Sequence, residues 1–360
     1  MKTTQWLDDT DAALADAAQR FLQEQYRFDT RMQHTAQQRR FDARIWNALG
    51  LMGWCAVAAD ESLGGLGYRP SSIVLLAQAA GQALLAEPFI SSGVIAVQLL
   101  AACQPGAERD RLLALALQGH ACIVATPMLA AAAAAHSRVS GDLAWVPDAD
   151  IAQTLLVPVQ GAGLYVVPAD SAGLSRHALP LVDGRGAASV ALRACHATLL
   201  AESTPGAMAQ ADEQARRLAS LAVAADSVGV MQGAMALTLE YLKTRKQFGV
   251  TLGQHQVLQH RAVDMYIRLA ESESVVRQAM RSLACGATDC AAQVHAAKAV
   301  ACDSARRVTQ EAVQLHGGIG ITEEYAISHY LRRARVNEQL HGSTAHHLQA
   351  FATATPCAQP

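Results

Sequence analysis

Apolar residues recur at intervals of three and four over the first third of the chain and again over its last third. In the first third this spacing is clear at 12–26 and 72–85, and the pattern continues to about residue 118. A second helical region begins near residue 206, with long segments at 256–283 and 293–315. This spacing places apolar side chains on one face of a helix, so we expect mainly helical structure in both regions.

The segment between these regions, from about 119 to 202, follows a different pattern. Short runs rich in Val and Leu alternate with turn residues, at the regular spacing typical of an antiparallel β domain of modest size. We expect strands at 122–124, 143–146, 155–159, 164–167 and 188–192, and turns at 140–142, 160–161, 170–171 and 183–184. The alanine run at 130–135 has no clear place in this pattern.

The order helical, β, helical predicts three domains in a protein that is mainly α. They are an N-terminal helical domain at 1–118, a middle antiparallel β domain at 119–204 and a C-terminal helical bundle at 205–360. The last region holds three or four long helices, which permits an antiparallel bundle.

Composition excludes several classes of protein. With 51% hydrophobic and 17% charged residues, the 360-residue chain is not a disordered polymer. Its 29 basic and 31 acidic residues argue against a nucleic-acid binder that relies on neutralising phosphates. The eight cysteines lack the spacing of a disulfide framework or a zinc site. We find neither a signal peptide nor a membrane span, and we expect a cytoplasmic protein.

Three clusters of residues are candidates for ligand binding, and the first is RKQFG at 245–249 with Gln256 beyond it. Basic residues followed by glycine suit the end of a helix, so this cluster has a purely structural explanation. In the functional alternative, Arg245 presents a planar, bidentate donor to a phosphate. Phe248 then offers a flat face beside a ring system.

The second cluster is QLHGGIG at 314–320, whose glycines end a helix and let a ligand or another backbone approach. It lacks the preceding strand and the spacing of a dinucleotide fingerprint, so a Rossmann fold is not favoured. The third cluster is LHGSTAHHL at 340–348, where a glycine and two hydroxyl residues open a helix whose N–H groups could meet a phosphate. Its histidines lack a suitably spaced carboxylate or cysteine, so we expect no metal site.

Together the three clusters resemble the pattern of the acyl-CoA dehydrogenase family in order and approximate spacing. The matching motifs are RKQFG at 245–249, QVLQH at 256–260, QLHGGIG at 314–320 and the stretch 330–348, with LGGLGY at 63–68 and GDLAWVPDAD at 141–150 in the earlier regions. The resemblance implies an N-terminal helical domain, a small β-barrel or sandwich, and a C-terminal four-helix bundle.

The resemblance also implies FAD, bound between the β domain and the bundle and partly across a subunit interface. Arg245, Phe248 and Gln256 match the positions that hold its adenine and pyrophosphate portion. Gln314, Gly317 and Gly318 match the loop that meets FAD from a neighbouring subunit, and Ser343 and Thr344 match cofactor contacts after the base position. A homo-oligomer, or a hetero-oligomer with a related subunit, would then complete the site.

The family removes the α-proton and a β-hydride from an acyl-CoA thioester, giving a 2-enoyl-CoA and reduced flavin. An electron-transfer flavoprotein is the electron acceptor expected by analogy. The family's usual base is a Glu directly before the Gly of a Glu-Gly-Thr motif, and here His341 precedes Gly342. The alternative base position, on the first bundle helix, matches Ala219, and Ser220 replaces an Arg common there.

Three hypotheses for the base follow. His341 itself could act, because imidazole titrates near neutrality, or Glu338 could act from one helical turn earlier. Otherwise the chain is a catalytically silent partner that binds FAD or supports a larger subunit. GSTAHHL at 342–348 resembles the ending of small family members that pair with catalytic chains in steroid side-chain degradation, which favours a bulky or branched acyl group. Of the family's Thr-Glu-Pro-Gly flavin loop, Thr126 and Pro127 remain.

Overall fold

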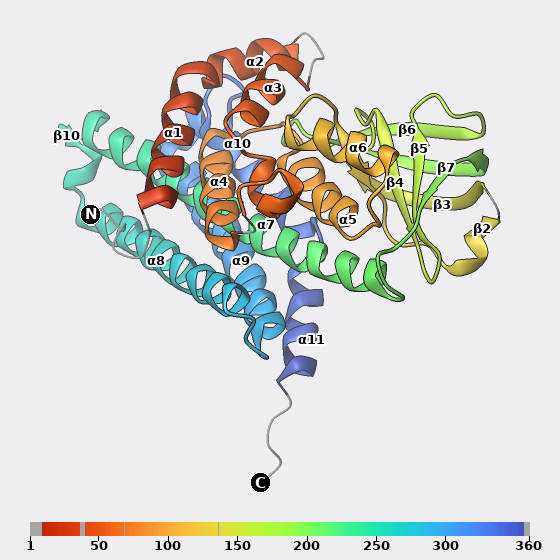
Figure 1. Cartoon of the computed structure of the whole chain (residues 1–360). Coiled ribbons are helices and arrows are strands. Elements are labelled where there is room, and N and C mark those ends of the chain that lie inside the picture. Colours follow the sequence, from red (N-terminus) through yellow and green to blue (C-terminus); the bar gives the residue numbers. More distant parts are fainter. Residues whose placement is uncertain (1–8, 37–39, 68, 136, 356–360) are drawn as a thin grey trace. The chain divides into compact units, whose positions relative to one another are not determined.

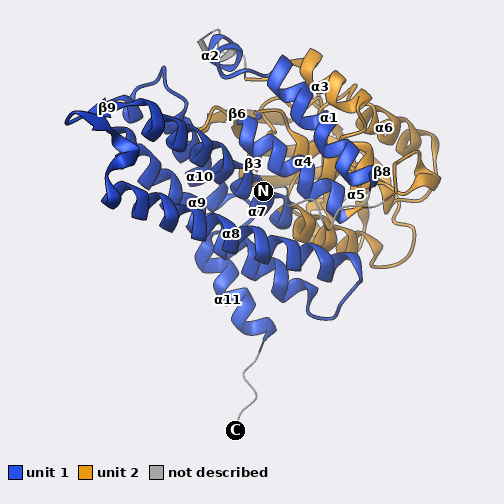
Figure 2. Ribbon diagram, turned by 90° about the vertical axis from the view of Figure 1, so that its left-hand side faces the viewer, with its two compact units in different colours: residues 1–37, 70–85, 220–360 blue, residues 38–69, 86–219 orange. Residues whose placement is uncertain are grey.

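The computed structural model describes residues 9–36, 40–67, 69–135 and 137–355 (Figure 1). Tyr68, which ends the LGGLGY motif, lies outside these residues. The chain divides into two compact units, which Figure 2 colours separately. Unit 1 comprises 1–37, 70–85 and 220–360, and unit 2 comprises 38–69 and 86–219. The three-domain division at 1–118, 119–204 and 205–360 stays a prediction.

Unit 1 is helical and holds the long C-terminal helices. Its elements are α1 (Asp9–Gln25), α2 (Phe28–Ala36), α4 (Pro70–Ala83), most of α7 (Ala207–Thr244), α8 (Gln256–Ala284), α9 (Cys290–His316), α10 (Ile327–Gln339) and α11 (Thr344–Ala354), with short turns η5 (Leu252–Gln254) and η6 (Gly317–Ile321) and a hairpin of β9 (Lys246–Gln247) and β10 (Val250–Thr251). The predicted helices at 256–283 and 293–315 are therefore confirmed as α8 and α9.

Glycines allow α4 and α7 to cross closely within unit 1. A Cβ at Gly81 would lie 2.0 Å from the carbonyl oxygen of Asp226, and one at Gly229 would lie 2.0 Å from that of Gln78. Backbone therefore packs directly against backbone at this crossing, as only glycine permits. The crossing fixes the α7 segment that carries Asp226.

Unit 2 combines short helices with two sheets. Its helical elements are α3 (Ala43–Leu51), η1 (Ala56–Ala58), η2 (Glu61–Leu63), the π-helix η3 (Phe89–Ala96), α5 (Val97–Ala101), α6 (Ala107–Leu117) and η4 (Ala131–Ala133). The strands are β1 (Ile123–Ala125), β2 (Ala134–Ala135), β3 (Arg138–Pro147), β4 (Thr154–Val159), β5 (Gly163–Pro168), β6 (Leu174–Pro180), β7 (Gly186–His196) and β8 (Thr198–Leu200).

The described strands of unit 2 form two four-stranded sheets, ordered β1-β4-β5-β8 and β2-β3-β7-β6, and neither closes into a barrel. Both contribute to one apolar core: Leu155 and Val167 come from the first sheet and Val139 and Val190 from the second. Their packing is therefore that of a small sandwich. The fold class, mainly α with a middle β region, is confirmed.

Three details of the β region differ from the prediction. The turn predicted at 140–142 is wrong, because these residues continue β3, where the register with β7 shifts between Val139 and Gly141. A glycine in such a bulge resembles a turn in sequence. The prediction missed β6 and β8, since β6 is largely exposed and lacks an apolar run. In addition, β1 pairs with β4 in parallel, whereas the pairs of β4 with β5 and of β3 with β7 are antiparallel.

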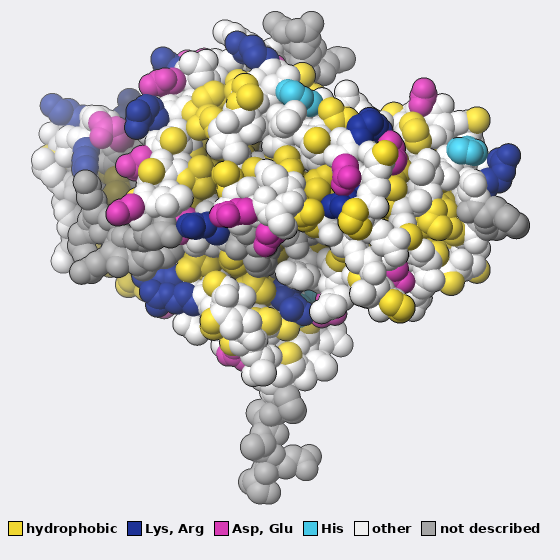
Figure 3. All heavy atoms as spheres, viewed as in Figure 1, with side chains coloured by type: hydrophobic (Ala, Val, Ile, Leu, Met, Phe, Trp, Pro, Cys, Tyr) yellow, Lys and Arg dark blue, Asp and Glu magenta, His cyan; other side chains and the backbone are white. Residues whose placement is uncertain are grey.

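Burial and surface charge agree with a folded, near-neutral protein. Among the described helices α7 alone is long and apolar enough to cross a membrane, but 83% of its most apolar window is buried inside the protein. Core packing thus accounts for its composition. On the face shown in Figure 3, acidic and basic side chains are interspersed and do not form a field of one sign. Six described cysteines, at residues 55, 103, 122, 195, 285 and 302, are free thiols.

Candidate functional site

The nine candidate residues of the three clusters lie in unit 1, at or beside the ends of its C-terminal helices. Arg245, Phe248 and Gln256 lie between α7 and α8, and Gln314, Gly317 and Gly318 lie at the end of α9. His341, Ser343 and Thr344 connect α10 to α11. Each cluster thus adjoins a helix end, as its sequence predicts.

The first cluster is a tight hairpin that presents an aromatic ring to solvent. Phe248 and Gly249 form its turn with φ of 57° and 84°, so both adopt the left-handed conformation. Phe248 is 87% exposed, and the ring of His255 meets its ring edge-on at a centroid distance of 6.1 Å. The buried Nε2 of His255 has no hydrogen-bond partner in the described part of the chain. Sequence reasoning missed His255, whose position directly before Gln256 was the available signal.

The second cluster lies beside the first. The ring of His316, the last residue of α9, stacks on that of Tyr241 of α7 with centroids 4.5 Å apart. Tyr241 precedes Arg245 by one helical turn, and the amide of Arg245 donates to its carbonyl oxygen. Burial lowers the pKa of His316, while its Nδ1 donates to the carbonyl of Ala312. The structure therefore joins the Arg245 hairpin to the Gln314 loop.

The third cluster is a sharp connection between two helices. His341 has φ of 54° and Gly342 has φ of 111°. Ser343 caps α11, where its side chain accepts a hydrogen bond from the amide of His346. The hydroxyl of Thr344 is buried and has no hydrogen-bond partner among the described residues. An unpaired buried hydroxyl is costly, so this atom fits a site that a ligand completes.

Within a single chain, the third cluster lies far from the other two. The ammonium of Lys298 on α9 contacts the carbonyl oxygen of Gly342 at 3.2 Å. Gln314 lies sixteen residues further along the same helix, which corresponds to about 24 Å. A ligand touching both ends would therefore have to span unit 1 or draw its contacts from two copies.

A buried polar network supports the third cluster. Arg333 of α10 forms an ion pair with Asp226 of α7, and Asn337 donates from Nδ2 to the same carboxylate at 2.6 Å. Lys298, which has no exposed surface, donates to the carbonyl of Asn337 at 2.9 Å. Sequence reasoning missed this network. Charged residues within apolar helical stripes were the signal that could have revealed it. Its members hold the end of α10 from which the His341 loop departs.

His347 contacts the same loop from α11. Its Nε2 lies 3.1 Å from the carbonyl oxygen of His341, and because a carbonyl can only accept, this nitrogen carries the proton. Its Nδ1 therefore accepts from Nδ1 of His295, 2.8 Å away. Burial and the nearby Lys298 charge lower the pKa of His347 to about 4. The imidazole is accordingly neutral at physiological pH.

Neither position that the family resemblance assigns to the base holds a carboxylate. Ala219 is fully buried, and His341 is half-buried. The carboxylate of Glu338 lies 2.8 Å from Arg335 and 4.0 Å from Arg306, so it takes part in ion pairs on α10 and α9. These contacts favour a structural role for Glu338. No three His, Cys, Asp or Glu side chains of the described residues are arranged to hold a metal.

Thr126, in the segment that resembles part of the family's flavin loop, is well anchored in unit 2. Thr126 is fully buried, its amide donates to the carbonyl of Leu156, and its own carbonyl accepts from Arg216 at 2.9 Å. Arg216 in turn pairs with Asp212 at 2.8 Å. The start of α7 thus fixes the backbone that follows β1.

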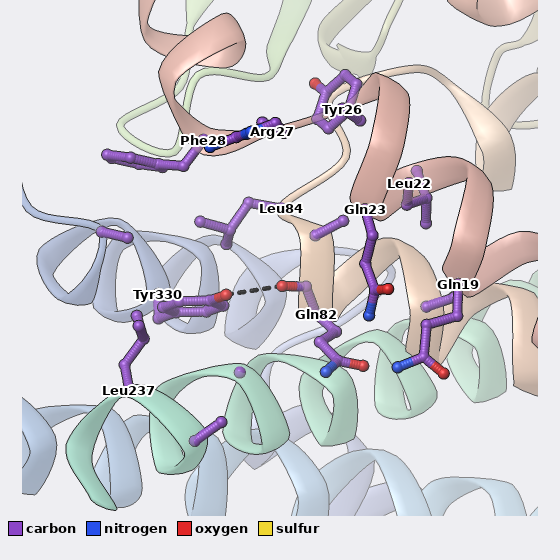
Figure 4. A pocket seen from close by; sticks show the side chains of 15 residues that line it. Gln19, Leu22, Gln23, Tyr26, Arg27, Phe28, Gln82, Leu84, Leu237 and Tyr330 are labelled. Carbon is purple, nitrogen blue, oxygen red and sulfur yellow. Dashed lines mark hydrogen bonds between the residues drawn. The ribbon is translucent and has the colours of Figure 1, made fainter. Parts of the chain in front are cut away.

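A separate pocket of about 280 Å³ lies in unit 1 between α1, α4, α7 and α10 (Figure 4). Tyr330 packs against Gly233, where a Cβ would come within 2.5 Å of its hydroxyl oxygen, and this hydroxyl donates to the carbonyl of Gln82 at 2.7 Å. Figure 4 shows Gln19, Gln23 and Gln82 on one side of the pocket. None of the nine predicted residues lines it, so the pocket is distinct from the three clusters.

Two family models match the chain. One, described as the N-terminal domain of acyl-CoA dehydrogenase, covers residues 8–120, and the other, described as the C-terminal domain, covers 213–355. Acyl-CoA dehydrogenase FadE27 of Mycobacterium tuberculosis is 29% identical over 325 residues, which span 84% of this chain and 85% of that protein.

Solved structures show the same fold. A steroid ACAD variant of Tcur3481–Tcur3483 is 26% identical with a TM-score of 0.83, over 96% of this chain and 97% of that one. The ChsE4–ChsE5 complex of Mycobacterium tuberculosis contains a chain 23% identical with a TM-score of 0.87, over 98% of this chain and 99% of that one. The sequence motifs, the two family matches and this fold together establish that the chain belongs to the acyl-CoA dehydrogenase family.

Proposed function

We propose that the chain binds FAD and takes part in the α,β-dehydrogenation of an acyl-CoA thioester to a 2-enoyl-CoA. The observation that carries the proposal is the buried, unpaired hydroxyl of Thr344, in the first turn of α11 and three residues after His341. Bound FAD supplies hydride acceptance. The protein must then supply a base, an environment that excludes water and contacts that hold both ligands.

The exposed ends of the bundle are suited to hold the cofactor. Arg245 can bind a phosphate through two N–H groups, Gln256 can donate and accept through its amide, and Phe248 offers a ring face. Gly317 and Gly318 let the backbone approach a ligand closely, and Gln314 adds an amide that can donate and accept. Since Gln314 lies about 24 Å along α9 from Lys298, which contacts Gly342, we expect two subunits to complete each site.

The α-proton requires an acceptor near the thioester, and His341 is our candidate. A neutral imidazole can take the proton and return it to solvent. Ser343 and Thr344 follow in the first turn of α11, where N–H groups without intrahelical partners can stabilise negative charge. We propose that the reaction occurs in the cytoplasm, that the acyl group is bulky or branched, and that an electron-transfer flavoprotein accepts the electrons.

A second candidate function is that of a partner subunit whose related chain supplies the base. The observation that favours it is the lack of a carboxylate at residues 219 and 341, together with the ion pairs of Glu338. In that arrangement this chain binds FAD or completes the partner's site. Both functions predict an oligomer and bound flavin, and they differ in whether the chain alone turns over a thioester.

Visible spectroscopy of the purified chain, followed by anaerobic titration with short, branched and polycyclic acyl-CoAs, tests both functions. Flavin absorbance that bleaches with one class supports the dehydrogenase and identifies its substrate. Bound flavin that bleaches only after a related catalytic chain is added supports the partner role. A protein that stays colourless when mixed with FAD, with or without such a chain, contradicts both.

A further inference from the structure

We propose that Lys298 and His347 are positioning residues that hold the connection between α10 and α11 by its backbone carbonyls. They would thereby set where His341 and Thr344 meet substrate and cofactor. The catalytic consequence of this inference rests on the proposed function. The restraint that Lys298 and His347 place on the connection can be measured without an activity assay.

Lys298 joins the two ends of the connection. Its ammonium donates to the carbonyl of Asn337, in the last turn of α10, and to the carbonyl of Gly342, two residues before α11. The last carbonyls of a helix lack intrahelical donors, and a cation there is favoured by the helix dipole. The side chain is fully buried, and its donors meet main-chain oxygens, which keeps the backbone on either side of His341 at a fixed separation.

His347 binds the carbonyl of His341, which lies between the two carbonyls that Lys298 contacts. Its Nε2–H donates to the carbonyl of His341, while His295 supports the ring from the opposite nitrogen. A Cβ at Gly342 would lie 2.9 Å from Nε2 of His347, so the ring closes directly over the connection. The two side chains thus bind three carbonyls within six residues of chain.

This arrangement explains how His341 keeps an uncommon conformation. A non-glycine residue with positive φ, here 54° at His341, persists only when its surroundings fix it. Because the hold uses main-chain oxygens, it does not depend on which side chain occupies position 341. A histidine can therefore stand where the family's usual motif has a glutamate without loss of the connection's geometry.

Hydrogen–deuterium exchange on the full-length, FAD-supplemented protein tests whether Lys298 and His347 restrain the connection. We expect Lys298→Met and His347→Leu to raise exchange of the amides at 340–346 at least tenfold and to leave α8 unchanged. His347→Gln, which keeps an N–H donor, should stay within threefold of wild type. The control is Thr309→Val, which removes a buried hydroxyl that bonds within α9. Unchanged exchange in both Lys298→Met and His347→Leu, or an equal rise in Thr309→Val, would overturn the inference.

Turnover then tests the consequence. With any partner chain that the activity requires, Lys298→Met and His347→Leu should each lower kcat at least tenfold, leave KM within threefold and retain flavin. His347→Gln should recover most of the loss seen in His347→Leu. Faster exchange at 340–346 without a change in kcat would overturn the positioning role. A wild-type protein that never binds flavin would instead contradict the proposed function, and the exchange result would still decide whether Lys298 and His347 hold the connection.

Discussion

Arg333 of α10 and Asp226 of α7 face each other inside unit 1, with Nε and Nη2 of the guanidinium 3.0 and 2.6 Å from the two carboxylate oxygens. Their side chains are 5% and 2% exposed. Asn337, one helical turn further along α10, donates to the same carboxylate. This pair fixes α10 at the point where the helix approaches the His341 connection, so the stability of the bundle and the geometry of the candidate site depend on the same contact.

We expect Arg333→Gln to lower the free energy of unfolding by about 3–5 kcal/mol, because it leaves the buried Asp226 charge without its main partner. The matched control is Arg332→Gln, one residue earlier on α10. Arg332 pairs with Glu323 at the surface, where the two side chains are 34% and 49% exposed. Such pairs contribute about 0–1 kcal/mol. Urea unfolding measures both, and equal losses would contradict the special role of the buried pair.

Gly342 is required both for its backbone conformation and for the space it leaves. With φ of 111°, a Cβ there would also lie 2.7 Å from the ring of His346. We expect Gly342→Ala to lower the free energy of unfolding by about 1–3 kcal/mol. Gly286, which has φ of 63° and where an added Cβ would meet no atom within 4 Å, is the control for backbone strain alone. Thermal unfolding should show a clearly larger loss for Gly342→Ala, and similar losses would argue against close packing at the connection.

The helices of the bundle could be predicted closely because their apolar stripes and terminal glycines are local signals. The segment 256–283 differs from α8 at one residue, and 293–315 begins three residues after α9 does. The β region was less predictable. Gly141 looks like a turn but lies in a bulge of β3, and the exposed β6 lacks an apolar run, because pairing with β7 rather than burial defines it.

The candidate residues were predictable from motifs, whereas their support was not. The ends of α7 and α9 and the start of α11 fall where the motifs indicated. Lys298, however, is a lysine within an apolar stripe, and a single sequence does not reveal that backbone carbonyls surround it. The same holds for His347, whose neighbour His346 is exposed. Their roles depend on contacts between helices that are distant in sequence.

Stability should depend on pH through His347. Its folded pKa is about 4, whereas an unfolded histidine titrates near about 6.5. As the pH falls from about 6.5 to 4, the unfolded chain binds a proton at residue 347 that the folded chain does not. The contribution of His347 to the free energy of unfolding is therefore fully present above about pH 6.5 and is lost as the pH falls toward about 4. Lys298 and His295 on α9 and His346 beside it add positive charge that opposes protonation.

The comparison that isolates this contribution is wild type against His347→Gln, since other buried histidines such as His316 also titrate with a lowered pKa. Urea unfolding between pH 4 and 7 should give a shallower fall for His347→Gln. Identical slopes for the two proteins would mean that His347 is not buried in its neutral form.

Phe248 is exposed in the isolated chain and is predicted to serve binding rather than stability. We expect Phe248→Ala to leave the free energy of unfolding of the cofactor-free chain within about 0.5 kcal/mol and to reduce the flavin-to-protein ratio after purification. Leu51→Ala, at a side chain that is 82% exposed in unit 2, is the control. Full flavin retention in Phe248→Ala would remove this residue from the cofactor site.

The identity of the base can be tested at position 341. If His341 accepts the α-proton, His341→Ala should lower kcat by about 10²–10⁴-fold while flavin stays bound. His341→Glu should retain turnover, because a carboxylate desolvated by the acyl chain is also a competent base. His346→Ala, at the exposed histidine of the same motif, should stay within threefold of wild type. Turnover that survives His341→Ala would assign the base to a partner chain, and the low pH limb of the rate profile would then follow that chain's residue.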